Sequence, residues 1–373
     1  MSKDNKNLHR DVITQIPQYV AGKSMEDVKK EYNLSEVVKL ASNENILGPS
    51  PKAMKAITDN IGKLNLYPDP EANMLRDKIA SFIDVERENL IVGNGSDELI
   101  SLISMAFLHR NEEIIMPWPS FIRYMHNAII MEAKTTLVPL GNDFKYDTQA
   151  IVDAVNYKTK FIYITNPNNP TGRIMNREQM EYMIEGCPDE IILIIDEAYK
   201  EFVEDEDYPE TVDLVKKYPN KNVIILRTFS KLYGLAGLRC GYAISRKPLI
   251  KLLMRAKAPF NLNFLAQVAA CAAIDDKEHF EKSRKLAIDE KIYIYRRLLE
   301  NNIRFVPSET NFILIDTGID GEAVFKKMQE KGIIVRDMKM YKLDTYIRIT
   351  IGLREQNKKM LDELIKLIKK KAE

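Results

Sequence analysis

Residues 191–196 read Ile-Ile-Leu-Ile-Ile-Asp, five apolar residues in a row that end in an acid. Such a run, in which no polar residue alternates, is typical of a β-strand that is covered on both faces, as in a parallel sheet. Similar runs recur through the middle of the chain, with amphipathic helical patterns between them. The predicted strands are residues 90–92, 113–116, 161–165, 191–195, 223–226 and 240–244, and the clearest helices are residues 98–107, 148–155 and 177–185. This alternation predicts an α/β fold with a mainly parallel sheet flanked by helices.

The pattern changes after about residue 262. A long helical region from residue 264 to about residue 301 leads into a segment that alternates short strands with helices to the end of the chain. We therefore expect a large domain at residues 41–262 and a smaller α+β domain at residues 263–373. Residues 1–40 fit no strand of the large sheet and are predicted to form an N-terminal arm that joins the smaller domain.

The composition excludes several classes of protein. The 373 residues include 45% apolar and 29% charged residues with a formal net charge of +1, so attraction to nucleic acid or to an anionic membrane is not expected. No uninterrupted apolar run approaches the roughly 20 residues that span a bilayer, and the N-terminus lacks the apolar core of a signal peptide. The three cysteines and four histidines are scattered, which favours neither a disulfide framework nor a metal site. A soluble cytoplasmic protein is the expectation.

A glycine turn follows the first predicted strand. Residues 93–97 read Gly-Asn-Gly-Ser-Asp and lead into a helix. The free N–H groups and the dipole at such a helix start can bind a phosphate. An ordinary capped turn explains the residues equally well, because Ser96 and Asp97 are both common N-cap types. Glu98 stands at the third glycine position of a G-x-G-x-x-G motif, which disfavours a dinucleotide site.

A second loop, Asn-Pro-Asn-Asn-Pro-Thr-Gly at residues 166–172, follows the strand at 161–165. Its prolines and glycine fix the backbone, so its amide side chains can be aimed at a fixed target. The carboxyl ends of parallel strands are where such folds bind ligands. A rigid turn alone would explain the prolines but not the two asparagines between them.

Asp196, at the end of the apolar run, needs a cationic partner, because an unpaired buried acid is costly. One candidate is Mg²⁺ on a nucleotide, as in P-loop ATPases, with the phosphate loop at residues 22–24 (Gly-Lys-Ser). However, Pro17 stands where that loop needs its first glycine, and no strand precedes it. The other candidate is a protonated heterocyclic nitrogen, such as the pyridinium of pyridoxal 5'-phosphate (PLP).

The segment after the strand at 223–226 favours PLP. Residues 227–239 read Arg-Thr-Phe-Ser-Lys-Leu-Tyr-Gly-Leu-Ala-Gly-Leu-Arg. Lys231 lies between hydroxyl residues and a loop with glycines, a setting that suits a lysine able to form a Schiff base. Three nearby residues can bind one phosphate by hydrogen bonds and charge, namely Thr228, Ser230 and Arg239.

The chain resembles the class I and II aminotransferases of fold type I over nearly its whole length, and among them most closely the histidinol-phosphate aminotransferases. The matching stretches are residues 40–45 (LASNEN), 67–69 (YPD), 95–98 (GSDE), 168–172 (NNPTG), 196–199 (DEAY), 228–239, 334–337 (IVRD) and 346–350 (YIRIT). One position departs from the pattern, because Ile46 follows Asn45 where the family usually has proline.

This resemblance implies roles for the matching residues at the cofactor. Lys231 would carry PLP through a Schiff base and move the proton between substrate and cofactor, and Asp196 would pair with the pyridinium. Asn169 and Tyr199 would hydrogen-bond the phenolic oxygen. Phe121, otherwise a core residue, would stack on the ring. The residues implied at the phosphate are Ser96, Asp97, Thr228, Ser230, Arg239 and, from the neighbouring subunit, Tyr67. A homodimer is therefore implied.

For the substrate, the resemblance implies Arg348 as the main anion clamp, with Tyr19, Asn43 and Arg336 as further contacts. An arginine fork suits a carboxylate or a phosphate. The expected reaction, a step of histidine biosynthesis, converts L-histidinol phosphate and 2-oxoglutarate to imidazole-acetol phosphate and L-glutamate. Two alternatives stay open, an aromatic or broad-specificity aminotransferase and a PLP lyase resembling threonine-phosphate decarboxylase. Both would keep every cofactor residue.

Overall fold

The structure of the protein is a computed structural model that describes residues 8–18 and 23–372. Its centre is a seven-stranded sheet, the large sheet, in the order β2-β8-β7-β6-β5-β3-β4. Its strands are β2 (Leu90–Gly93), β3 (Glu113–Trp118), β4 (Lys134–Pro139), β5 (Thr159–Thr165), β6 (Ile192–Asp196), β7 (Val223–Thr228) and β8 (Gly241–Ser245). Only β8 runs against its neighbours in this sheet, and the other strands share one direction. The predicted α/β fold with a mainly parallel sheet is confirmed.

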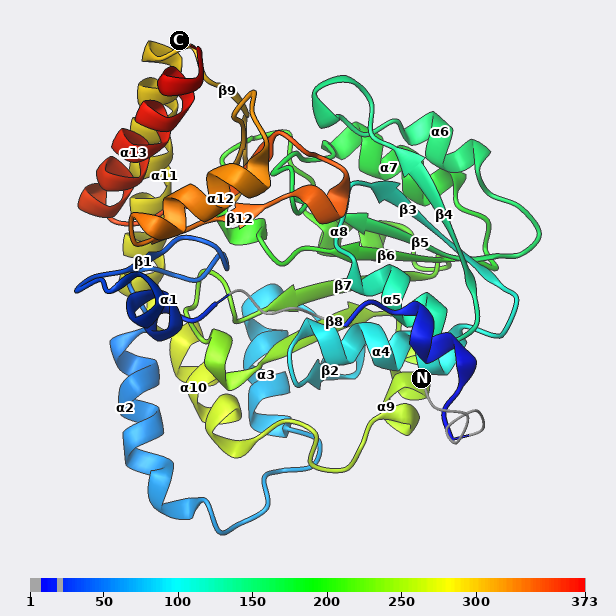
Figure 1. Cartoon of the computed structure of the whole chain (residues 1–373). Helices are drawn as coiled ribbons and strands as arrows, with labels where there is room; N and C mark the ends of the chain where they lie inside the picture. Colours follow the sequence, from blue (N-terminus) through cyan, green and yellow to red (C-terminus); the bar gives the residue numbers. More distant parts are fainter. Residues whose placement is uncertain (1–7, 19–22, 373) are drawn as a thin grey trace.

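Helices cover both faces of the large sheet (Figure 1). On one face, Ile192 and Ile194 of β6 belong to the core under α4 (Ser96–Phe107), α5 (Arg123–Ile130) and α9 (Lys247–Ala256). Leu193 and Ile195 belong to the core on the other face. The helices on that face are α2 (Pro51–Asn60), α3 (Asn73–Ile83), α6 (Thr148–Asp153), α7 (Arg177–Gly186), α8 (Thr211–Lys217) and α10 (Phe264–Ile274). Burial on both faces explains why β6 is apolar without alternation.

All six strands predicted from the sequence are present, and their ends lie within two residues of the predicted ones. The sequence does not predict β4. This strand lies at the edge of the large sheet, and most of its side chains are exposed or half-buried. An edge strand of this kind needs no apolar run, so no hydrophobic signal marks it.

The C-terminal part forms a second, antiparallel sheet, the small sheet, in the order β12-β13-β10-β9. Its strands are β9 (Arg304–Val306), β10 (Phe312–Asp316), β12 (Arg336–Asp337) and β13 (Tyr346–Thr350). Three helices, α11 (Lys277–Glu300), α12 (Gly321–Glu330) and α13 (Arg354–Ala372), pack against it through one apolar core. Figure 1 shows this part beside the large sheet, with α11 in yellow, α12 in orange and α13 in red.

The N-terminal segment contacts both parts. A short 3-10 helix, η2 (Asp11–Gln15), lies against α5, and Arg10 pairs with Glu132 at 2.8 Å. After α1 (Met25–Tyr32), strand β1 (Val38–Lys39) pairs in parallel with β11 (Ile333–Ile334) of the C-terminal part. The domain boundaries at residues 40/41 and 262/263 stay a prediction, and α10 packs against α2 and α3. Within residues 8–18 and 23–372, no helix is long and apolar enough to cross a membrane.

Candidate active site

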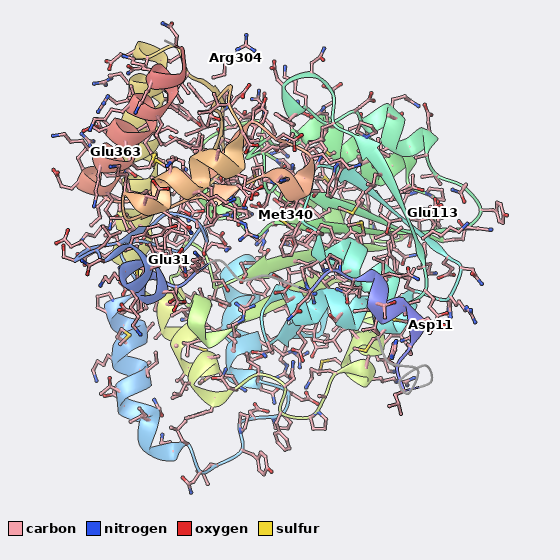
Figure 2. All side chains as sticks on the ribbon, viewed as in Figure 1. Asp11, Glu31, Glu113, Arg304, Met340 and Glu363 are labelled. Carbon is pink, nitrogen blue, oxygen red and sulfur yellow. The ribbon has the colours of Figure 1, made fainter. Side chains whose placement is uncertain are left out.

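A cavity of about 570 Å³ lies between the carboxyl ends of the large-sheet strands and the small sheet. The residues that line it from the large sheet are Ser96, Asp97, Phe121, Asn169, Asp196, Tyr199, Thr228, Ser230, Lys231 and Arg239. Asn43, Arg336 and Arg348 line the opposite side together with Met340, which is labelled near the centre of Figure 2. The loops after neighbouring parallel strands thus meet at one edge of the sheet, where α/β folds bind ligands.

Among the predicted site residues that the structure describes, Tyr67 alone does not line this cavity. Tyr19 lies outside the described residues. Tyr67 is 83% exposed, and its ring stacks on Phe260 with 4.7 Å between the ring centroids. The cavity walls include no metal cluster, since the described part of the chain holds no group of three or more His, Cys, Asp or Glu that could bind a metal ion.

Asp196 is the buried acid of the cavity, only 3% exposed at the end of β6. The Tyr124 hydroxyl donates to Asp196 Oδ2 at 2.8 Å, and the Ala198 N–H donates to Oδ1 at 3.1 Å. Burial raises the pKa of Asp196 to about 6, and these two hydrogen bonds act in the opposite direction. A cation facing the carboxylate would stabilise its charged form.

Lys231 lies on the loop after β7, next to β6 in the sheet. Its Nζ is 5.4 Å from the centroid of the Tyr199 ring. The loop is fixed by a hydrogen bond from the Gly234 N–H to the Lys231 carbonyl at 3.0 Å. Gly234 has a φ of +71°, and a Cβ there would lie 2.2 Å from the Gly48 carbonyl oxygen. Only glycine fits this turn, which holds the lysine against the cavity.

Four groups converge beside Lys231 at the start of α4. The N-cap of this helix is Gly95, no side chain caps the helix, and Ser96 and Asp97 of its first turn line the cavity, so the N–H groups of this turn are open to a ligand. Arg239 Nη2 lies 3.6 Å from Asp97 Oδ2, and a Cβ on Gly95 would come within 2.8 Å of the same Nη2. The hydroxyls of Thr228 and Ser230 are 3.0 Å apart. Two hydroxyls, a guanidinium and a helix start together suit a phosphate.

The small sheet contributes two arginines to the cavity wall. Arg348 lies on β13, inside the sheet and 8% exposed. Its guanidinium donates to Asn169 Oδ1 and, at 3.0 Å, to the Ala41 carbonyl. Arg336 stands directly opposite Arg348 in the register of β12 and β13. Two like charges on facing positions repel each other, so a bound anion would stabilise the pair.

Asn43 joins the two sides of the cavity. Its N–H donates to Thr350 Oγ1 and its Nδ2 donates to the Tyr199 hydroxyl, both at 2.9 Å. The nearby turn contains Ile46. Asn45 Oδ1 accepts from the Leu47 N–H at 2.9 Å, and its Nδ2 donates to the Leu232 carbonyl at 2.6 Å. The Asn45 side chain therefore fixes this turn without the usual proline.

Sequence reasoning missed several residues of the site. Tyr124 contacts Asp196, and the cavity is also lined by Thr165, Lys23 and Lys39. No local signal marks Tyr124, because its partner Asp196 lies 72 positions away. The two lysines carry no signal either, since lone lysines are ordinarily solvated.

Comparisons with known proteins agree with this geometry. A sequence model of the family described as aminotransferase class I and II matches residues 35–365. The histidinol-phosphate aminotransferase of Geobacillus sp. (strain WCH70) is 42% identical, covering 95% of this chain and 97% of that protein. The histidinol-phosphate aminotransferase of Moorella thermoacetica is 39% identical, covering 96% of this chain and 92% of that protein. The crystal structure of histidinol-phosphate aminotransferase from Sinorhizobium meliloti, in complex with PLP, superposes with a TM-score of 0.90 at 24% identity, covering 99% of this chain and all of that one. That similarity shows the same fold.

Proposed function

The chain belongs to the class I and II aminotransferase family, and from this premise we propose that it is a PLP-dependent aminotransferase of histidine biosynthesis. It converts L-histidinol phosphate and 2-oxoglutarate to imidazole-acetol phosphate and L-glutamate. The observation that carries the proposal is one cavity in which Lys231, Asp196 and a phosphate seat lie together, with Arg348 on the facing wall. Relatives about 40% identical over nearly the whole chain are named for this substrate.

The cavity residues match the groups of PLP. The seat at the start of α4 would hold its phosphate, Asp196 would face its ring nitrogen, and Lys231 would bind its aldehyde carbon. The raised pKa of Asp196, about 6 because of burial, fits a carboxylate whose natural partner is a cation. Phe121 would cover one face of the ring, and Asn169 and Tyr199 would hydrogen-bond its phenolic oxygen. When bound, PLP withdraws electrons from the substrate carbon that bears the amino group, which makes the proton on that carbon acidic.

The remaining chemistry belongs to the protein. Lys231 Nζ takes the proton from the substrate carbon that bears the amino group, acting as a general base. It then acts as a general acid and gives the proton to the cofactor carbon bound to the same nitrogen. Asp196 keeps its negative charge against the ring, and Tyr199 is held in place by Asn43 at 2.9 Å. Arg348 binds the carboxylate of glutamate or the phosphate of histidinol phosphate, because its fork accepts either anion.

A two-step absorbance experiment tests this proposal. The purified protein is mixed with PLP, and the visible spectrum is recorded before and after L-histidinol phosphate is added without an acceptor. We expect the lysine-bound spectrum to form and then to convert to that of the aminated cofactor, and 2-oxoglutarate to restore it. Release of CO₂ from threonine phosphate, offered in place of L-histidinol phosphate and without consumption of 2-oxoglutarate, would instead indicate a lyase. Equal conversion by aromatic amino acids would indicate a broad-specificity aminotransferase.

Arg348 gives a sharper test of substrate binding. In Arg348→Lys the charge stays but the bidentate fork is lost. A hydrogen bond to a charged group contributes about 1.5–3 kcal/mol, so losing one bond of the fork should raise KM for both L-histidinol phosphate and L-glutamate by roughly 10²-fold, with a smaller fall in kcat. Steady-state kinetics measure both. Arg304→Lys, on the exposed end of β9 (Figure 2), is the matched control, and equal KM values in the two variants would remove Arg348 from the substrate site.

We further propose a homodimer in which Tyr67 reaches the PLP phosphate of the partner subunit. Tyr67 lies in a segment with several exposed apolar residues, namely Ile61, Leu64 and Leu66, which are 55%, 60% and 62% exposed. Clustered exposed apolar side chains mark interaction surfaces. The free cysteines fit a cytoplasmic location, where thiols stay reduced.

Tyr67→Phe removes only the hydroxyl, so the dimer should persist while PLP binds more weakly. A hydrogen bond to a charged group contributes about 1.5–3 kcal/mol, and we expect the Kd for PLP to rise by about 10- to 100-fold. Equilibrium titration measures the Kd, and sedimentation reports the assembly state. Tyr157→Phe, at a residue 91% exposed, is the control. A dimeric Tyr67→Phe variant with the Kd of the control would refute the shared site.

A further inference from the structure

Tyr124 is a buried tyrosine behind Asp196 that the proposed mechanism does not use. It is 1% exposed, and its hydroxyl lies 2.8 Å from Asp196 Oδ2 and 3.0 Å from Thr165 Oγ1. Its ring stacks on Tyr163 with 4.2 Å between centroids and meets the Phe121 ring edge-on at 5.6 Å. Packing therefore fixes the hydroxyl in place, and burial raises the pKa of Tyr124, so the hydroxyl keeps its proton.

A chain of hydroxyl groups continues from Tyr124. Thr165 Oγ1 lies 2.9 Å from Ser120 Oγ, and Ser120 Oγ lies 3.0 Å from Asn168 Oδ1. The Asn168 amide is oriented by its Nδ2, which donates to the Pro119 carbonyl at 3.0 Å and to Thr171 Oγ1 at 2.8 Å. Asn168 Oδ1 is thus an acceptor, and Ser120 donates to it.

The protons of this chain can be counted in both states of Asp196. Four contacts join the carboxyl, three hydroxyls and the amide oxygen, and the hydroxyls of Tyr124, Thr165 and Ser120 hold three protons. When Asp196 is ionised, Tyr124 donates to it and one of the four contacts lacks a proton. When Asp196 is protonated, its own proton fills the chain, and each hydroxyl donates to the next group along. The chain therefore accommodates both states, because the Tyr124–Asp196 contact reverses its direction while Ser120 continues to donate to Asn168.

We propose that Tyr124 is a positioning residue for the cofactor's ring nitrogen: its hydroxyl donates to Asp196 when the carboxylate faces the protonated ring, and turns to Thr165 when Asp196 is neutral. The inference rests on the proposed PLP function. A hydrogen bond to an ionised carboxylate is roughly twice as strong as one between neutral groups. Tyr124 consequently favours the ionised state, which is the state that holds the ring.

The other charged groups near Asp196 have partners of their own. Asp97 on α4 is 3.4 Å from Arg123 and 3.6 Å from Arg239. Glu197 contacts Arg227 at 2.8 Å. Both acids raise the pKa of Asp196, less than burial does. Lys231 faces the same cavity. None of these groups is changed by a substitution that removes only the Tyr124 hydroxyl.

The test is the pH dependence of cofactor affinity in the full chain. Pyridoxamine 5'-phosphate, which has the ring and phosphate of PLP but no aldehyde to react with Lys231, is titrated calorimetrically into PLP-free wild type and Tyr124→Phe between pH 5 and 9. We expect the variant to bind about tenfold more weakly at pH 8. The Tyr124 hydrogen bond lowers the pKa of Asp196, so its loss should make Asp196 take up a proton at a higher pH. We therefore expect the pH below which affinity falls to move upward by about one unit in the variant. The ligand phosphate titrates identically in every protein, so the difference reports Asp196.

Tyr163→Phe is the matched control, since it removes a hydroxyl from the ring stacked on Tyr124 without touching Asp196. Thr165→Val removes the oxygen to which the Tyr124 hydroxyl turns when Asp196 is neutral, so it should lower the pH below which affinity falls, opposite to Tyr124→Phe, and it serves if the latter does not fold. If Tyr124→Phe binds the probe with the same affinity and the same pH midpoint as Tyr163→Phe, the role proposed for Tyr124 is wrong, while the aminotransferase proposal stands. Failure of the wild type to bind the probe at all would refute the proposed function itself.

Discussion

Lys231→Ala is expected to reduce the rate of transamination by about 10⁴-fold or more. The substitution removes the covalent attachment of the cofactor and the group that moves the proton, and general acid–base catalysis alone contributes about 10²- to 10⁴-fold. The neighbouring seat for the phosphate does not include the lysine side chain, so PLP should still bind. Single-turnover measurements with L-histidinol phosphate and a large excess of enzyme give the residual rate.

Added small amines sharpen this test. A primary amine such as methylamine can enter the space left by the lysine side chain and accept the proton, so it should restore part of the rate in proportion to its concentration. Lys251→Ala, an exposed position on α9, controls for the loss of a lysine. Near-normal transamination by Lys231→Ala would mean that the central assignment is wrong.

The fold could be predicted from the sequence where burial leaves a strong pattern. In β6, Ile192 and Ile194 pack on one face and Leu193 and Ile195 on the other, so the strand is apolar throughout and stands out. The edge strand β4 has neither an apolar run nor an alternation of apolar and polar residues, because part of the strand is exposed to solvent. The three-residue strand β9 is too short to show a period.

The cofactor side of the site could also be predicted, for a topological reason. Asp196 and Lys231 each follow a buried strand, and the strands β6 and β7 are parallel neighbours. In a parallel sheet the residues after such strands must meet at one edge. Motifs that look unrelated along the chain therefore identify one cavity.

What the sequence could not show depends on contacts between distant segments. Tyr124 and Asp196 are 72 positions apart, and nothing local marks the tyrosine as a partner of the acid. The pairing of Arg336 with Arg348 depends on the register of β12 and β13. Tyr67 is 83% exposed and does not line the cavity of its own chain, so the role proposed for it requires a second copy.

Asp196→Asn is expected to lower kcat by about 10²- to 10⁴-fold and, in the PLP-free protein, to raise stability. Losing one partner of a buried ion pair costs about 3–5 kcal/mol. Since each step of about 1.36 kcal/mol of activation free energy changes a rate tenfold, this cost corresponds to the expected loss in kcat. An asparagine gives the cofactor ring no charge to hold its proton. The asparagine oxygen can accept from the Ala198 N–H while its Nδ2 donates to the Tyr124 hydroxyl, which then donates to Thr165, so each of these groups keeps a partner.

The stability effect follows from the sign of the pKa shift. Burial raises the pKa of Asp196 to about 6, against about 3.9 in an unfolded chain. Between these values the folded protein binds the extra proton, so its stability falls as the pH rises through this window, by about 3 kcal/mol at pH 7 and above. At pH 4 the aspartate is neutral in the folded state and about half neutral in the unfolded state, so most of this effect is absent and the two proteins should unfold at similar urea concentrations. At pH 7.5 PLP-free Asp196→Asn should need more urea than the wild type. If the two proteins differ in the urea concentration of unfolding by the same amount at pH 4 and pH 7.5, Asp196 carries no buried charge for the cofactor to balance. If this difference in urea concentration is present only at the higher pH, the protein gives up stability to keep a charge that its ligand needs.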